Sequence, residues 1–337
     1  MDDVDAAQRG LTHYFGARGI GAHNSWPHAI RADLEFDYWW LAHLIDARVD
    51  GFERSGDGRY LLEAERIYRA LRLRNGGRLF NRYFDDMMWL GCALARLGPH
   101  THERYLDDAE RLWRHALARG WNDSHGPSLA WRSTQLDYKN APANGPFAIL
   151  GARLERIRPA GRAEKARAAF DWMHTRLRDD ASGFVADGIG REGGSVRDDR
   201  AFSYNHGVYI GAAVALHRLD PDPGLLADAT LTALDAIRRL APHGVFVDQG
   251  SGDGALFGGI YCRFVAELLG TAAVPPAAAT ELRAFVESST RTLVRNARVE
   301  DLLRAGPVWD RPAPEPSSLA AQLSAVLALE AAAVIRG

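Results

Sequence analysis

The sequence predicts an all-α fold, an (α/α)6 barrel made of six helical hairpins. Apolar residues recur at helical spacing along most of the chain, and the helical segments come in pairs. The first helix of each pair begins roughly 50 to 65 residues after the previous one, a period typical of stacked hairpins. The last segment has no partner after it, but segment 4–15 can supply one. This closure favours a ring over an open solenoid, and we expect one domain over residues 1–337.

The first helix of a pair carries small and aromatic residues on most faces, as helices of a buried inner ring should. The first pair opens with Asp33, an acid at a capping position, and a break at Gly98-Pro99 divides the second. Segments with strand-like alternation are scarce, and we expect 244–249 at the edge of a loop. In chain order the predicted pairs are 33–50 with 60–73, 84–97 with 103–120, 144–157 with 163–177, 204–219 with 224–240, 256–270 with 278–297, and 317–335 with 4–15.

Parallel inner helices place all their N-termini at one end of the barrel, which we call the mouth. The loops that precede the inner helices are longer and richer in Trp, Tyr, Asn and Gly than the loops within pairs. The mouth therefore collects long loops and the positive ends of the helix dipoles, and we expect the functional site there.

Two consecutive acids, Asp85 and Asp86, stand at the mouth position of the second pair. Tandem acids at a helix start have an ordinary explanation, since one caps the first turn and the other complements the dipole. This pair differs because Tyr83, Phe84 and Trp89 flank it, and aromatic surroundings desolvate carboxylates. Adjacent Cα atoms lie about 3.8 Å apart, which allows the carboxyl separation of about 5–5.5 Å found in retaining glycosidases. Like charges this close resist joint ionisation, so one group can stay protonated as an acid while the other attacks.

Other mouth positions carry groups suited to sugars, which bind aromatic faces and planar amide or carboxylate groups. Each is weak alone, because Asn-Gly and Asp-Gly are common turns, but they recur at the same end of successive pairs. The candidate binding residues are Tyr83, Trp131, Tyr138, Asn140, Asn144, Asp187, Tyr204, Asn205 and His206.

Five segments of the sequence resemble those of a known family. They are YFDDMMWLGCALARL, DYKNAPANGPFAILGARL, VADGI, YNHGVYIGAAVALHRL and GDGALFGGIYCRFVAEL. In this order they resemble glycoside hydrolase family 76, the endo-α-1,6-mannanases. The resemblance implies an (α/α)6 barrel and retaining hydrolysis of α-1,6-mannosidic bonds in mannan or manno-oligosaccharides, with no metal or cofactor. It also implies that Asp85 is the nucleophile and Asp86 the general acid/base, with Asn140, Asp187 and Tyr204 lining the sugar subsites.

Three features depart from the family pattern. His206 stands where a Gln usually follows the Tyr-Asn pair, and Gly258 replaces a Lys, so both positions bear on subsite specificity. The family is usually secreted, yet the start of this sequence is acidic and lacks the basic and apolar regions of a leader. We therefore expect a cytoplasmic protein acting on a shorter oligosaccharide.

The composition argues against several other classes. A formal net charge of −2 gives no reason to expect nucleic acid as a partner, and no uninterrupted apolar run approaches the 18 or so residues that span a bilayer. The His100–Glu103 stretch lacks zinc-helix spacing, and Asp248 with Asp253 lacks the ligand series of a calcium loop, so we expect turns there. Dinucleotide, nucleotide and serine-hydrolase motifs are missing. We expect a monomer without metal or cofactor.

Two alternatives stay open. A sugar 2-epimerase shares the barrel architecture but needs histidines as proton carriers, for which His206 is the well-placed candidate. A noncatalytic carbohydrate-binding barrel is the other, and the intact Asp85-Asp86 pair argues against it.

Overall fold

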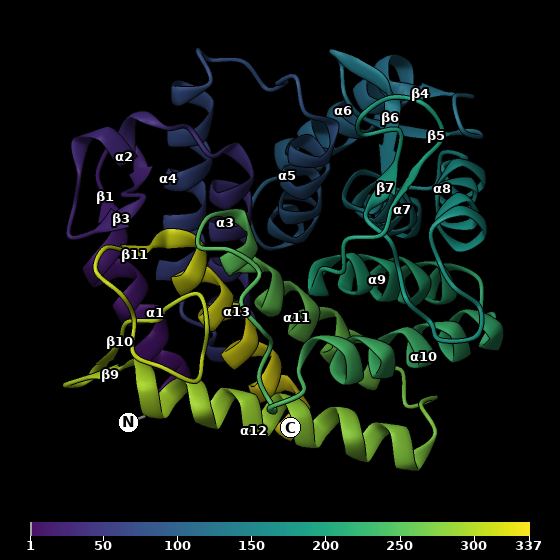
Figure 1. The fold of residues 1–337 in the computed structure, drawn as a ribbon. Helices are drawn as coiled ribbons and strands as arrows, with labels where there is room; N and C mark the ends of the chain where they lie inside the picture. Colours follow the sequence, from purple (N-terminus) through teal and green to yellow (C-terminus); the bar gives the residue numbers. More distant parts are fainter. Residues whose placement is uncertain (1) are drawn as a thin grey trace.

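The computed structural model describes residues 2–337, and Met1 lies outside the described residues. Six helices form an inner ring in which each helix packs against the next and the last packs against the first (Figure 1). In order around the ring they are α3 (Tyr38–Ser55), α5 (Phe84–Leu97), α7 (Ala141–Ile157), α9 (Ser203–Leu219), α11 (Phe257–Leu269) and α13 (Leu319–Arg336). The chain is mostly helical, as the sequence predicts.

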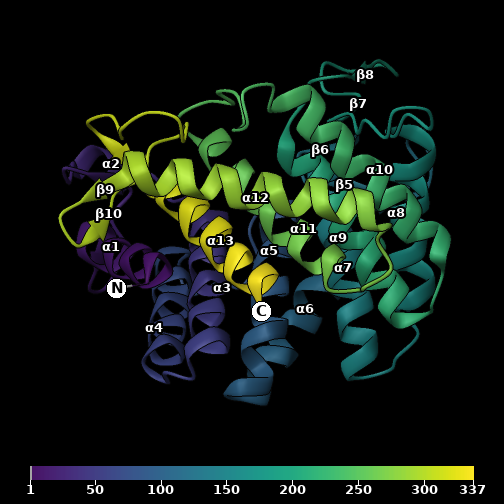
Figure 2. The same cartoon turned by 90° about the horizontal axis from the view of Figure 1, so that it is seen from below.

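A second helix follows or joins each ring helix on the outside. These outer helices are α4 (Arg59–Arg74), α6 (Glu103–Gly120), α8 (Ala163–Arg176), α10 (Pro223–Leu240), α12 (Pro276–Ala297) and α1 (Asp3–Phe15). α1 packs against α13, so segments from the two ends of the chain complete the ring, as predicted. The long helix α12 lies across α13, α10 and α11 (Figure 2).

Glycines allow the ring helices to approach one another closely. At four successive interfaces a Cβ on the glycine would lie 2.3–2.5 Å from an atom of the next ring helix, closer than packed atoms tolerate. These glycines are Gly91 against Leu150, Gly145 against Val208, Gly211 against Phe264, and Gly259 against Ser324. The small residues noted in the sequence therefore set the spacing of the inner ring.

The apolar helix α13 is long and apolar enough to cross a membrane by length and composition alone, with a mean hydropathy of 1.6 over Leu319–Arg336. In the structure 83% of this segment is buried. Its apolar character follows from its place in the ring, where neighbouring helices cover nearly every face.

The first predicted helix is interrupted. Instead of running on from Asp33, the chain forms the short helix α2 (Ile30–Leu34) and resumes as α3 after Asp37. The side chain of Asn24 explains the break, because its Nδ2 donates to the carbonyl of Glu35 at 3.0 Å and to Oδ2 of Asp37 at 3.2 Å. Asn24, which lies outside the predicted segment 33–50, thus holds the turn between α2 and α3.

A five-stranded antiparallel sheet, which the sequence did not predict, lies at the mouth. Its strands, in spatial order, are β4 (Trp121–Asn122), β5 (Ser128–Arg132), β6 (Gln135–Asn140), β7 (Gly188–Ile189) and β8 (Arg197–Asp198). The remaining short elements are β1 (Gly16–Ala17), β2 (Gly21–Ala22), β3 (Ser25–Trp26), β9 (Arg298–Val299), β10 (Leu302–Leu303), β11 (Ser317–Ser318) and the 3-10 turns η1 (Gly98–His100) and η2 (Asp253–Leu256). Segment 244–249 forms no strand, as expected.

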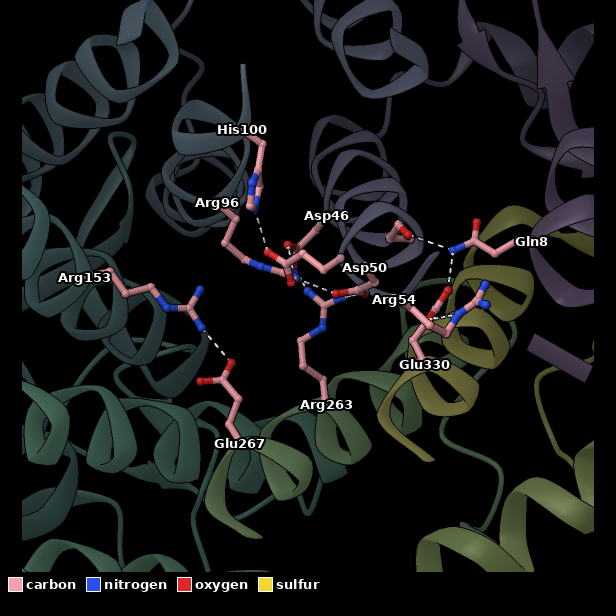
Figure 3. Close-up of polar contacts among 12 residues, drawn as sticks. Gln8, Asp46, Asp50, Arg54, Arg96, His100, Arg153, Arg263, Glu267 and Glu330 are labelled. Atoms are coloured by element: carbon pink, nitrogen blue, oxygen red, sulfur yellow. Dashed lines mark hydrogen bonds and ion pairs between the residues drawn. The ribbon is translucent and has the colours of Figure 1, made fainter. Parts of the chain in front are cut away.

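The opposite end of the ring is closed by ion pairs, which we call the closing network (Figure 3). It joins the C-terminal halves of all six ring helices around a cavity of about 700 Å³. Cations at helix C-termini complement the helix dipoles as well as the acids beside them. Its members are Asp46, Asp50, Glu53 and Arg54 of α3, Arg96 of α5, Arg153 of α7, Arg218 of α9, Arg263 and Glu267 of α11, and Glu330 of α13.

Candidate active site

Asp85 and Asp86 lie in the first turn of α5, just inside the residue that begins the helix. Neither carboxylate takes the capping position, which belongs to Tyr83 and makes no side-chain cap. Oδ2 of Asp85 accepts a hydrogen bond from the indole N–H of Trp131 at 2.9 Å, and Oδ2 of Asp86 accepts one from the amide of Asn81 at 2.8 Å. Oδ1 of Asp85 is buried and has no hydrogen-bond partner among residues 2–337. The pair therefore keeps one carboxylate oxygen for another molecule.

The surroundings of Asp85 and of Asp86 affect the pKa of each carboxyl differently. Burial raises the pKa of Asp85, and the Trp131 indole opposes that rise. Burial raises the pKa of Asp86 well above its ordinary value, and the negative charge of Asp85 raises it further. Asp86 is accordingly the member that retains a proton when Asp85 ionises.

The sheet brings a group of aromatic and basic side chains to Asp85. The ring of Trp131, on β5, lies 5.3 Å from that of Tyr83 and 5.5 Å from that of Tyr138 on β6. The guanidinium of Arg132 lies 4.6 Å from the centre of the Trp131 ring. Three predicted binding residues, Tyr83, Trp131 and Tyr138, thus gather beside Asp85.

Asp187 is a buried carboxylate that ties the sheet to α9. Its Oδ2 accepts from the hydroxyl of Tyr138 at 2.6 Å and from the guanidinium of Arg191 at 2.5 Å, and its Oδ1 accepts from the amide of Asn205 at 3.2 Å. Arg191 also pairs with Asp198 at 2.7 Å. Both oxygens of the Asp187 carboxylate therefore accept hydrogen bonds, and through them Asp187 positions Tyr138 and Arg191.

Tyr204 lies in the first turn of α9. Its ring stacks on Phe257 with centroids 3.7 Å apart and planes 2° from parallel. Burial raises the pKa of its hydroxyl well above the ordinary value, and the charges of Asp187, Asp85 and Asp253 raise it further. The pKa of the predicted residue Tyr204 therefore responds to the charges of acids that come from different elements.

Three predicted binding residues have their side chains engaged within the protein. Asn144 is fully buried and joins α7 to β5 through the N–H and carbonyl of Leu129, at 2.8 and 2.9 Å. The Oδ1 of Asn140 caps α7 by accepting from the N–H of Ala143 at 3.2 Å. Asn205 is buried against Asp187.

His206 is placed away from the mouth, contrary to the expectation that it lines a subsite. It is fully buried between α9 and α10, with Nδ1 at 2.9 Å from the carbonyl of Phe202 and Nε2 at 3.4 Å from Asp235. It is one residue beyond Asn205 on the helix, so its side chain projects about 100° further round the axis. The departure at His206 therefore bears on packing.

Gly258 lies near the start of α11. A Cβ at this position would lie 3.2 Å from the ring of Phe246 and 3.5 Å from that of Trp309. These two rings stand where the family's lysine side chain would begin.

A second group of mouth residues stands outside the list of candidate site residues, and the sequence offered only its Gly252-Asp253-Gly254 turn, as a weak candidate. Asp253 of η2 was interpreted as part of a turn, yet its Oδ1 accepts from the indoles of Trp39 and Trp40 at 3.1 and 3.0 Å. Asp37, at the start of α3, is close enough for Asp253 to raise its pKa, which burial and that charge bring to about 6. The available signal was the string Asp-Tyr-Trp-Trp at the start of an inner helix, since the next inner helix also has acids and aromatic residues at its start. Among residues 2–337, no group of three His, Cys, Asp or Glu side chains is arranged to hold a metal ion.

The sequence model of glycosyl hydrolase family 76 matches residues 2–334. The chain belongs to glycosyl hydrolase family 76. A comparison with curated proteins gave no match.

Solved structures, family 76 enzymes among them, match over nearly the whole chain. The Lin0763 protein of Listeria innocua is 34% identical, with a TM-score of 0.93 over 99% of this chain and 97% of the other. The α-1,6-mannanase GH76A of Salegentibacter sp. HEL1_6 is 32% identical, with a TM-score of 0.92 over 98% of each chain. The family 76 mannosidase Bt3792 of Bacteroides thetaiotaomicron, at 16% identity and a TM-score of 0.81 over 99% of this chain and 97% of that one, shares the fold. Family 76 structures are (α/α)6 barrels, in agreement with the ring seen here.

The Trp131→Phe variant of this family 76 protein should lose activity first on the acidic side of the pH profile. Without the indole N–H the charged form of Asp85 loses a donor, so the pKa of Asp85 rises and a larger fraction is protonated at a given pH. Loss of a hydrogen bond to a charged group should raise the ratio of protonated to ionised Asp85 on the order of tenfold at a given pH. The acidic limb of kcat/KM should therefore move to higher pH. Trp121→Phe, on a ring that packs against Phe147, is the control, and an unmoved acidic limb in Trp131→Phe would contradict the assignment.

Proposed function

We propose that this family 76 protein is a retaining glycoside hydrolase that cleaves α-1,6-mannosidic bonds. The observation that carries the proposal is the Asp85-Asp86 pair, in which a buried Asp85 oxygen lacks a partner and Asp86 has the higher affinity for a proton. In support, a relative 31% identical over 98% of each chain was solved with α-1,6-mannotriose as an inactive variant with two consecutive aspartates replaced.

The geometry supports a two-step reaction. In the first step Asp86 gives its proton to the glycosidic oxygen, and Oδ1 of Asp85 attacks the anomeric carbon to form a glycosyl ester. The leaving sugar departs with that proton. In the second step ionised Asp86 removes a proton from water, whose oxygen attacks the same carbon and releases Asp85. Each of the two steps inverts the configuration at the anomeric carbon, so the product has the same α configuration as the substrate.

The sugar-facing surroundings suit this chemistry. Trp131 and Tyr83 present aromatic faces beside Asp85, and the ring of Tyr204 stacks on Phe257. We propose that the substrate is an α-1,6-linked manno-oligosaccharide or the corresponding polymer, acted on by a single-domain monomer. The 2-epimerase alternative is disfavoured because its candidate proton carrier, His206, is sealed between helices.

The proposal is tested by incubating the protein with α-1,6-mannan and with α-1,6-linked mannotriose and mannotetraose. New reducing ends are measured over time, and NMR follows the anomer formed before mutarotation. We expect hydrolysis with the α-anomer appearing first. A β-anomer appearing first would overturn the roles of Asp85 and Asp86. No product from any α-mannoside, by the wild-type protein and Asp85→Asn alike, would overturn the hydrolase itself and favour the binding barrel.

A further inference from the structure

The outer helix α4 carries a stripe of exposed leucines and arginines on its solvent side. Leu62, Arg66, Arg69 and Leu73 follow one another at intervals of four, three and four residues, so their side chains lie on one side of the helix. All four are exposed, Leu62 to 54% and Leu73 to 71%. An outer barrel helix normally turns its apolar residues inward. The two leucines therefore have no place in the packing of the barrel.

The short helix α2 adds a second pair of exposed apolar side chains. Ile30 and Leu34, one helical turn apart, are 83% and 78% exposed, more than any other large apolar residue among those described. No residue of α2 is buried. The guanidinium of Arg74 joins α2 to the end of α4, because it donates at 2.7 Å to the carbonyls of both Asp33 and Glu35 (Figure 1). The apolar residues of α2 thus lie next to the stripe on α4.

A cavity of about 680 Å³ lies beside the stripe, between α1, α4 and the hairpin of β1 and β2. Among residues 2–337, its three arginines Arg18, Arg66 and Arg69 make no ion pair and no side-chain hydrogen bond. The acid in the lining, Glu63, is bound instead to the buried Arg48 at 3.0 Å. The apolar part of the lining includes Leu11, Phe15, Leu44, Ile67 and Leu73. The cavity therefore combines apolar walls with cations that lack a counter-charge.

Positive charge is in excess on this face, although the net charge of the chain is −2. Other arginines of α4 are balanced, since Arg59 and Arg72 pair with acids at 2.6 and 3.7 Å. Arg31 of α2 adds an exposed cation, and Glu35 is the exposed acid at the edge of the face. The unpaired arginines outnumber that acid, so the face attracts anions.

The combination of cations and aliphatic side chains matches the surface of an anionic lipid bilayer. Arginines attract negatively charged headgroups, and apolar side chains beside them enter the boundary between headgroups and acyl chains. A nucleic acid would meet the arginines but offers no apolar layer for four exposed leucine and isoleucine side chains. Stable protein interfaces centre on aromatic anchors, whereas the exposed apolar side chains here are all aliphatic.

We propose that α2, the stripe on α4 and the adjoining cavity form a docking face for an anionic lipid surface. Arg18, Arg66 and Arg69 bind the headgroups, and the exposed Leu and Ile side chains enter the interfacial layer. α2 leads into α3, whose N-terminus lies at the mouth, so a docked bilayer lies on the mouth side of the barrel wall. None of these residues belongs to the candidate active site, and the proposal therefore does not depend on the proposed reaction.

Vesicle flotation with the full chain tests the docking face. One set of vesicles contains equal parts of phosphatidylglycerol and phosphatidylcholine, and the other contains phosphatidylcholine alone. We expect the protein to float with the anionic vesicles and to bind the zwitterionic ones far more weakly. Binding to the anionic vesicles should fall as salt is added, because salt screens the attraction between arginines and headgroups.

Two double variants separate charge attraction from apolar insertion. Arg66→Gln/Arg69→Gln should lower partitioning onto anionic vesicles roughly thirtyfold, since each arginine near such a surface strengthens binding about fivefold. Ile30→Ser/Leu34→Ser should weaken binding at least about tenfold, and this loss should persist at high salt because apolar insertion is not screened. All four side chains are exposed, so the Tm of both variants should stay at the wild-type value.

The matched control is Arg238→Gln/Arg291→Gln, which removes two exposed arginines from the outer helices α10 and α12. Its binding to anionic vesicles should equal that of the wild type. An equal loss in this control and in Arg66→Gln/Arg69→Gln would overturn the docking face, because any surface arginine would then serve.

The remaining outcomes also decide the proposal. It is overturned if the wild type does not float with anionic vesicles, or if both docking-face variants bind as tightly as the wild type. Polyglutamate is the competing probe. If the wild type ignores vesicles but binds polyglutamate through Arg66 and Arg69, the face accepts an acidic protein and the lipid surface is overturned.

Discussion

The Asp85→Asn variant should lose hydrolysis of α-1,6-mannan by a factor on the order of 10⁴ or more while keeping its fold. The change removes the attacking oxygen, and nucleophiles that act within a catalytic unit show losses of this size. The amide oxygen of asparagine can still accept from Trp131, so the local hydrogen bond survives. Removing a partly buried charge beside Asp86 also relieves repulsion, so Tm should stay the same or rise. Release of reducing ends and thermal unfolding are the measurements.

Asp86→Asn separates the two roles. Loss of a general acid costs about 10²- to 10⁴-fold with a poor leaving group and far less with an aryl leaving group that needs no proton. A mannoside carrying such an aryl group should therefore rescue the first step in Asp86→Asn but not in Asp85→Asn. The control is Asp107→Asn, the exposed member of the tandem pair of α6. Retention of more than a tenth of wild-type activity by Asp85→Asn would refute the assignment.

The Arg263→Met variant should destabilise the protein by about 3–5 kcal/mol without touching the active site. Arg263 crosses from α11 to bond Asp46 and Asp50 of α3, where all three side chains are largely buried. Removing one member of a buried ion cluster leaves carboxylates without compensation, which costs far more than the pair contributes on its own. Burial already raises the pKa of Asp50 to about 7, even with Arg96 opposing it. The loss is measured as a fall in urea midpoint and in Tm.

The pH dependence of that loss identifies its cause. A carboxylate left without its cation is costly only while charged, so the deficit of Arg263→Met should shrink as the pH falls and Asp50 takes up a proton. Arg238→Met is the control, because Arg238 is exposed and pairs loosely with Glu281 at 3.9 Å. It should cost less than about 0.5 kcal/mol. An equal, small effect from both variants would show that the closing network adds little to stability.

Local sequence patterns were sufficient for most helices. The predicted segments 84–97 and 103–120 coincide with α5 and α6, because Tyr83 and the Gly98-Pro99 break mark boundaries within the segment itself. The strands of the mouth sheet could not be predicted in this way. β4 and β7 are only two residues long, and β7 pairs with β6, which lies about fifty residues earlier in the chain.

The candidate site was predictable only in part for the same reason. Asp85 and Tyr204 were found because they lie in recognisable strings at helix starts. The bond between Asp253 and Trp39 joins residues 214 positions apart, and no local pattern reports it. His206 shows the opposite limit, since it is a neighbour of mouth residues in sequence but faces the outer helix layer in the structure.

The pairing of α1 with α13 has a consequence for how the protein is made. Gln8 donates to Glu330, 322 positions later, at 2.9 Å in the buried centre of that contact. At ribosomal speed the two helices emerge on the order of tens of seconds apart. Throughout that interval the side of α1 that packs against α13 has no partner, although Gln8 can already bond Arg48 of α3. The nascent chain therefore exposes that side of α1 until α13 is synthesised, and a circular permutant in which α13 directly precedes α1 would bring both helices of the pair out together.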